Sequence, residues 1–171
     1  VASLVGSEMC IRDRDGASHV FPEAFEPYRD HIPIEEQGDL IKAYYARLTS
    51  DDVEVRRGAA REWTRWEMAT SRLFPDPEYL DKAEDLDFAV AFARIECHYF
   101  INAIFVEEAY ILNNSSKIKH IPTVIVQGRY DMVCPPRSAW QLHKALPHSK
   151  LVMVADCLLY TSPSPRDWLQ S

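Results

Sequence analysis

The chain has 171 residues, of which 19 are Lys or Arg and 26 are Asp or Glu, so its formal charge is −7. This acidic balance excludes binding to nucleic acid through a basic surface, because no cluster of Lys and Arg can neutralise phosphates. With 47% hydrophobic and 11% aromatic residues, the chain is too apolar to be disordered. We expect one globular domain, or part of one, with a buried core.

Glycine and cysteine spacing excludes several kinds of site. No glycines have the spacing of the G-x-S-x-G nucleophile elbow, the phosphate-binding P-loop or the G-x-G-x-x-G dinucleotide turn. The sequence also has no C-x-x-C pair and no H-E-x-x-H motif, so we expect neither a structural zinc site nor a zincin. Widely separated cysteines favour reduced thiols and a cytoplasmic location. No apolar run approaches the roughly 20 residues that span a bilayer, so no membrane contact is expected.

The two ends of the chain differ from its middle. Residues 1–14 fit no element that continues into Asp15, and residues 157–171 form a Ser/Pro-rich run without periodicity. Both ends resemble translated adapter sequence, a recurring artefact of predicted environmental genes. We therefore interpret them as non-native tails that flank an insert of residues 15–156.

The first part of the insert predicts helices. Apolar residues repeat at helical spacing from Leu40 to about Thr49. Ser50 is a candidate N-cap for a second helix that reaches about Thr70. A third helix is expected from Asp85 to Ile101, with Phe88, Phe92, Ile95 and Tyr99 on one stripe, and a shorter one from Val106 to Leu112. These patterns predict a helical region over residues 15–118.

The period then changes to that of a strand, a helix and a strand. Thr123–Val126 and Leu151–Val154 are short apolar runs of the kind found in parallel sheets. A helix opens between them at Pro135, with Trp140, Leu142 and Leu146 as its apolar residues. Residues 119–156 therefore predict a βαβ unit, and the chain belongs to the α/β class.

Asp131 is the first candidate for a functional residue. It lies just past the carboxyl end of the first predicted strand, where open α/β sheets place their sites. A structural role, as a cap of the turn or of the next helix, is equally compatible with this position.

Two glutamates form the second candidate. Glu67 and Glu96 lie on separate predicted helices, each beside an apolar stripe, where a carboxylate needs a partner. Converging, they would bind a protonated amine. Salt bridges with Arg65 or Arg94 are the structural alternative.

Four stretches carry a resemblance to a known family. They resemble the prolyl aminopeptidases, or proline iminopeptidases, which are α/β-hydrolase serine peptidases with a helical cap. The stretches are GASHVFPEAFEPY, WTRWEMATSRLFPDP, FARIECHYF and IPTVIVQGRYDMVCPPRSAWQLHKALP. The resemblance implies a partial α/β-hydrolase: a helical cap followed by a C-terminal βαβ piece of the parallel sheet.

The resemblance also implies roles for the candidate residues. Asp131, in the G-R-Y-D motif, matches the triad acid that orients the catalytic histidine. Glu67 and Glu96 match cap glutamates that hold the cationic amine of the substrate. The implied reaction releases an N-terminal proline from a peptide through a serine nucleophile, without metal or organic cofactor.

The chain also departs from the family pattern. It has no G-x-S-x-G turn, and Leu159 stands where the family has its catalytic histidine. We therefore expect the chain as written to be inactive. The alternatives are a fragment of another capped α/β-hydrolase, such as an esterase or epoxide hydrolase, and a helical interaction module without catalysis.

Overall fold

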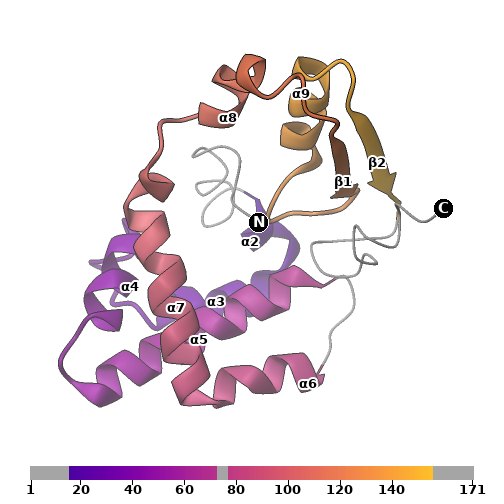
Figure 1. Ribbon diagram of the computed structural model, residues 1–171. Coiled ribbons are helices and arrows are strands. Elements are labelled where there is room, and N and C mark those ends of the chain that lie inside the picture. Colours follow the sequence, from indigo (N-terminus) through magenta and orange to yellow (C-terminus); the bar gives the residue numbers. More distant parts are fainter. Residues whose placement is uncertain (1–15, 73–76, 156–171) are drawn as a thin grey trace.

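The computed structural model describes residues 16–72 and 77–155, so both predicted tails lie outside the described residues. Helices fill the first part, and a βαβ unit follows (Figure 1). The α-helices are α2 (Ala17–Val20), α3 (Pro22–Asp30), α4 (Leu40–Leu48), α5 (Val53–Ser71), α6 (Pro77–Leu80), α7 (Leu86–Ile101), α8 (Tyr110–Asn113) and α9 (Pro136–Ala145). Short 3₁₀ turns cover Asp81–Glu84, Ala103–Phe105 and Ser115–Lys117. The strands are β1 (Val124–Gly128) and β2 (Lys150–Val154).

Aspartate N-caps fix the starts of α4, α5 and α7. The carboxylate of Asp39 accepts from the amide of Lys42 before α4, and that of Asp85 accepts from the amide of Phe88 before α7. Asp52 caps α5 by accepting from the amides of two residues in the first turn. The predicted cap, Ser50, was wrong: its hydroxyl instead accepts from the amide of Asp52 and shapes the turn before the cap.

The core of the helical region is a cluster of aromatic rings. Tyr28 of α3 stacks on Tyr44 of α4 with ring centroids 4.5 Å apart, and the Tyr44 hydroxyl donates to the Tyr28 carbonyl oxygen at 2.6 Å. Trp63 and Trp66 of α5 contact the same rings. A close approach at Gly58 completes this side, since a Cβ there would lie 3.3 Å from Cε1 of His31. The aromatic cluster holds α3, α4 and α5 together.

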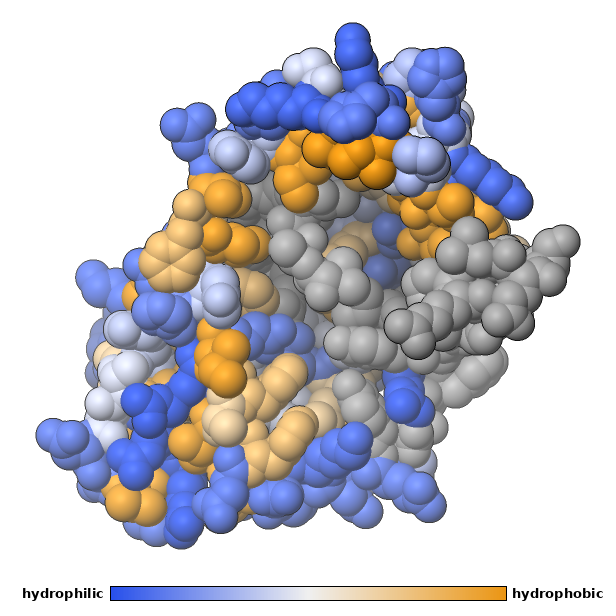
Figure 2. Space-filling model, in the orientation of Figure 1, coloured by the Kyte–Doolittle hydropathy of each residue, from blue (hydrophilic) through white to orange (hydrophobic). Residues whose placement is uncertain are grey.

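The buried face of α7 differs from the predicted stripe. Small side chains, Ala89, Ala93 and Cys97, are buried against the neighbouring helices α4 and α5. Of the stripe, Ile95 is 62% exposed and Tyr99 48% exposed. Apolar side chains accordingly reach the surface over α7 in Figure 2. Small residues let helices approach closely, so α7 buries its narrow face rather than its bulky one.

The segment after α7 also differs from the prediction. In place of a helix from Val106 to Leu112, only Tyr110–Asn113 is helical. Ala103, Ile104 and Phe105 all have positive φ, between 48° and 59°. This left-handed backbone ends α7 and delays the next helix.

The βαβ unit forms as expected. Strands β1 and β2 pair in parallel, with Val124 opposite Lys150 and Gly128 opposite Val154, and α9 connects them. The expected apolar residue Leu146 is buried, whereas Trp140 is 52% exposed. The change from helices to strands lies between Lys117 and Val124. That a domain boundary follows residue 118 remains a prediction.

Candidate functional site

Asp131 lies in the loop between β1 and α9. Its side chain is 3% exposed. The Oδ1 atom accepts hydrogen bonds from the backbone amides of Val133 at 3.0 Å and Cys134 at 2.7 Å. The loop after the parallel strand thus holds a buried carboxylate through its main-chain amides.

Gln127, the penultimate residue of β1, is the second side chain in this loop. Its Nε2 lies 3.3 Å from Oδ2 of Asp131 and 2.8 Å from the carbonyl oxygen of Cys134. The sequence analysis missed this residue. The one available signal was its position, four residues before the candidate acid at the end of a predicted strand.

Burial and hydrogen bonding act on Asp131 in opposite directions. Burial raises the pKa of the Asp131 carboxyl above its usual value, because desolvation disfavours the charged form. The amides of Cys134 and Val133 and the side chain of Gln127 lower that pKa by donating to the anion. The carboxylate is therefore shielded from solvent but still accepts hydrogen bonds from the protein.

Glu67 lies in the C-terminal half of α5 and is 5% exposed. Its helix face is unusually polar for a buried one, since Thr64, Thr70 and Ser71 are buried beside it. Two of these hydroxyls donate to carbonyls of their own helix: Thr70 to Trp66, and Ser71 to Glu67. The Oγ1 of Thr64 is buried without a hydrogen-bond partner among the described residues. A polar ligand beside Glu67 would find this hydroxyl ready to bind.

Glu96 lies on α7 and faces α5. Its Oε2 accepts a hydrogen bond of 2.9 Å from Nε1 of Trp63. Trp63 and Glu67 are four residues apart on α5, so they share one helix face. Glu96 therefore lies at the contact between α5 and α7, and Glu67 lies one helical turn along α5 from the tryptophan that Glu96 binds.

The structural alternative for the glutamates assigned them to salt bridges with nearby arginines. Arg65 instead pairs with Glu62 at 3.1 Å and with Glu84. Arg94 makes no ion pair in the described part of the chain and lines a cleft on the other side of α7. Neither arginine is therefore the partner that the alternative requires.

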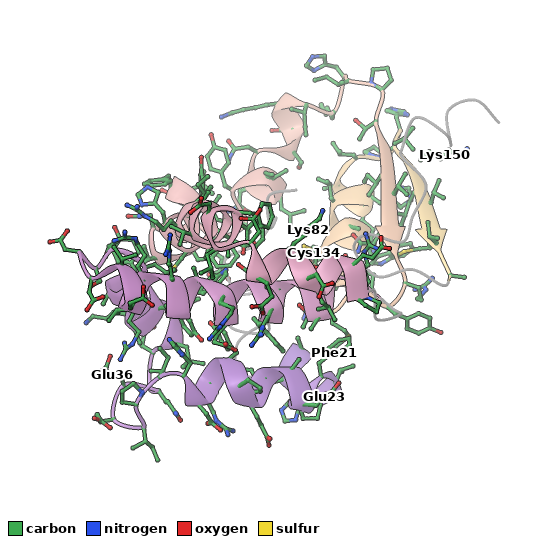
Figure 3. All side chains as sticks on the ribbon, turned by 90° about the horizontal axis from the view of Figure 1, so that it is seen from below. Phe21, Glu23, Glu36, Lys82, Cys134 and Lys150 are labelled. Atoms are coloured by element: carbon green, nitrogen blue, oxygen red, sulfur yellow. The ribbon has the colours of Figure 1, made fainter. Side chains whose placement is uncertain are left out.

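The loop of Asp131 reaches the helical region through its next residue. Met132 packs against the aromatic core of α3, α4 and α5. Figure 3, seen from below, labels Cys134 of the same loop. The acid and the glutamates thus belong to adjoining parts of the molecule, with the acid on the βαβ unit and the glutamates on the helices.

One described cleft lies away from these residues. It has a volume of about 700 Å³ and lies between α4 and α7, with Tyr45, Ile95 and Tyr99 in its lining. Tyr99 lines this cleft, while Trp63 and Trp66 are buried in the core. The cleft therefore does not include Glu67 or Glu96.

One serine and one histidine do meet in the βαβ unit. Nδ1 of His143 lies 2.8 Å from Oγ of Ser149, and this hydroxyl donates to the carbonyl oxygen of Leu146 at 2.7 Å. With its proton engaged there, Ser149 accepts from the imidazole, which is the reverse of what a nucleophile and its base require. The pair closes the turn after α9.

No group of three or more metal-ligating side chains gathers within residues 16–72 and 77–155. In the same residues, no single helix is long and apolar enough to cross a membrane. Helix α7 and the segment 103–113 pass that test only together, with a bend of 69° between them.

Comparison with protein families places these features in one fold. A family model described as the alpha/beta hydrolase fold matches residues 1–158. The chain belongs to the alpha/beta hydrolase fold family. Its parallel βαβ unit and buried acid after a strand agree with this membership.

Curated proteins of this hydrolase fold resemble the chain closely. A probable proline iminopeptidase of Leptolyngbya boryana is 59% identical over 144 residues, which are 84% of this chain and 45% of the relative. A proline iminopeptidase of Arabidopsis thaliana is 52% identical over 82% of this chain and 38% of the relative. One of Neisseria gonorrhoeae is 41% identical over 84% of this chain and 46% of the relative. The chain thus spans less than half the length of these relatives.

Proposed function

We propose that this chain carries the catalytic acid and the amine-binding residues of a prolyl aminopeptidase. Similarity to several proline iminopeptidases supports the activity. The observation that carries the proposal is the hydrogen bond from Trp63 to Glu96, because Trp63 lies one helical turn before the buried Glu67 on α5. Two carboxylates beside apolar residues suit a cationic amine attached to a small apolar ring.

The three residues have distinct roles in the proposed reaction. Glu67 and Glu96 hold the protonated amine of an N-terminal proline and so place the scissile carbonyl. A serine attacks that carbonyl while a histidine takes the serine proton and passes it to the leaving amine. Asp131 accepts the other N–H of the histidine and stabilises its charged form. Water then releases proline from the acyl-enzyme.

We further propose that the 171-residue chain is inactive, because it contains neither the G-x-S-x-G serine nor the matching histidine. The test is hydrolysis of a chromogenic proline amide by the purified chain. No release above the uncatalysed rate is expected. Hydrolysis that disappears in Asp131→Ala would refute this proposal.

The amine site is best tested in a chimera in which residues 15–156 replace the matching segment of the Leptolyngbya boryana relative, 59% identical to the chain. We expect Glu67→Gln and Glu96→Gln each to raise KM for proline amide about tenfold or more, since hydrogen bonds to charged groups are worth ~1.5–3 kcal/mol. Glu54→Gln, an exposed position on α5, is the control.

A neutral ester substrate separates the proposed activity from the alternatives. Because the ester has no amine to bind, its hydrolysis by the chimera should be unchanged in both glutamate variants. Equal losses on amide and ester would point to damaged folding. Unchanged selectivity in both variants would instead favour another capped hydrolase, such as an esterase or epoxide hydrolase. A chimera without hydrolase activity would favour a non-catalytic module.

The proposed location is the cytoplasm. The wide spacing of the cysteines in the sequence favours reduced thiols, which suits a reducing compartment. Fractionation of cells that express the chimera should recover it with cytoplasmic markers, and its recovery in a membrane or secreted fraction would contradict the proposal.

A further inference from the structure

The two carboxylate oxygens of Asp131 have unequal surroundings. Oδ1 accepts two backbone amides, those of Val133 and Cys134, which occupy both of its lone pairs. Oδ2 accepts only the side-chain amide of Gln127 among the described residues. One lone pair therefore remains on the carboxylate, and it belongs to Oδ2.

Both the main chain and the side chain of Gln127 are held in place, so Gln127 can fix the orientation of the Asp131 carboxylate and of that lone pair. Its backbone lies in β1, paired with Met153 of β2. Its side-chain nitrogen lies 2.8 Å from the carbonyl oxygen of Cys134, 3.3 Å from Oδ2 of Asp131 and 3.4 Å from the carbonyl oxygen of Gly128, so its two hydrogens are shared among three acceptors. One amide thus ties the last turn of the loop to the carboxylate.

We infer that Gln127 is the positioning residue of the catalytic acid: its amide fixes the Asp131 carboxylate so that Oδ2 presents its free lone pair to the catalytic histidine. The inference rests on the proposed function for the identity of that base. Gln127 touches neither substrate nor reacting atoms, and it acts through Asp131.

Two variants of nearly the same shape test this role. Gln127→Met keeps the length of the side chain and removes both hydrogen-bond donors. Gln127→Glu keeps the planar end group and, when ionised, places a second negative charge beside Oδ2. If the side chain only fills space, Gln127→Met behaves like the unmodified protein.

The matched control is Gln37→Met. Gln37 also donates from its side chain to two main-chain oxygens, of Arg29 and Ile32, but in the helical region away from the acid loop. Its loss should affect folding as the loss of Gln127 does, without touching Asp131.

The first measurement is a carbon-13 NMR titration of the Asp131 carboxyl in the complete 171-residue chain. Because the Gln127 amide donates to the charged form, its removal raises the pKa of Asp131 in Gln127→Met, and the added charge raises it further in Gln127→Glu. Gln37→Met leaves that pKa unchanged. The same Asp131 pKa in the unmodified chain and in both Gln127 variants would overturn the inference.

The second measurement is kinetic and uses the chimera described above. We expect Gln127→Met to lower kcat for proline amide about tenfold with KM nearly unchanged, because the amine site is intact while the base is misoriented. Full kcat in Gln127→Met also overturns the inference. If the unmodified chimera releases no proline, the proposed function fails, and the titration still decides whether Gln127 holds Asp131.

Discussion

The indole of Trp63 links the two candidate glutamates. It donates a hydrogen bond of 2.9 Å to Glu96 on α7, and it lies one helical turn before Glu67 on α5. A residue of the buried aromatic core therefore also orients a carboxylate of the proposed amine site.

Replacing this tryptophan tests the link. Trp63→Phe keeps an aromatic ring in the core and removes the N–H that Glu96 accepts. We expect a loss of about 1–3 kcal/mol in the free energy of unfolding, from the hydrogen bond to a charged group and the smaller ring. Urea denaturation of the 171-residue chain measures it. Trp140→Phe, at a half-exposed position, is the control, and an equal loss in both variants would contradict the link.

The start of α5 gives a second prediction. Asp52 accepts from the amides of Glu54 at 2.9 Å and Val55 at 3.3 Å, whereas Asp51 lies one residue outside the cap. Asp52→Ala should destabilise the chain by about 1 kcal/mol, the usual cost of a lost N-cap. Asp51→Ala is the matched control and should cost clearly less. Equal losses would show that the charge of this segment matters and the cap does not.

The buried acid predicts a pH dependence. Burial raises the pKa of Asp131 in the folded chain above the unfolded value of 3.8. The protonated acid therefore favours folding, and this contribution is complete below the unfolded pKa and is lost as pH rises through the folded pKa. Asp131→Asn, which carries no charge, should gain stability relative to the unmodified chain between acidic and neutral pH.

Urea denaturation at pH 3 and pH 7 checks this sign. The difference in unfolding free energy between Asp131→Asn and the unmodified chain should move in favour of Asn at the higher pH. Asp51→Asn, at an exposed position, serves as the reference. A move in favour of the unmodified chain would mean that the hydrogen bonds outweigh desolvation.

The left-handed segment after α7 yields a stabilising substitution. Ala103 has φ of 48° and an exposed side chain, so glycine adopts this backbone at lower cost and loses no packing. Ala103→Gly should raise the free energy of unfolding by up to about 1 kcal/mol. Ala91→Gly, within α7, should lower it by about 1 kcal/mol. Thermal denaturation of both variants compares the two directions, and destabilisation by both would contradict the left-handed conformation.

Much of the fold is predictable because its signals are local. Helical spacing of apolar residues marks α4, α5 and α7, and the β-branched runs mark β1 and β2 with a helix between them. Asp131 is predictable from the same patterns, because open α/β sheets place their functional sites at the carboxyl ends of parallel strands.

The buried face of α7 is not predictable in that way. Helical spacing puts the bulky Ile95 and Tyr99 on the expected stripe, yet the structure exposes them and buries the small Ala93 and Cys97. How closely two helices approach depends on the side chains of both, so the sequence of one helix does not predict the distance between them. Gln127 was missed for a related reason, because a glutamine is informative only once its neighbours in space are known.

The narrow face of α7 has a consequence for specificity. Ala89 and Ala93 are buried in the core with Ala59 and Ala60 of α5 and have no functional groups of their own. Their size nevertheless sets the gap between the helices, and so the span between Glu96 and Glu67. A single added methyl group at this contact would move α7 away from α5 and with it Glu96 of the proposed amine site, so residues that never touch a substrate would still affect the proposed specificity.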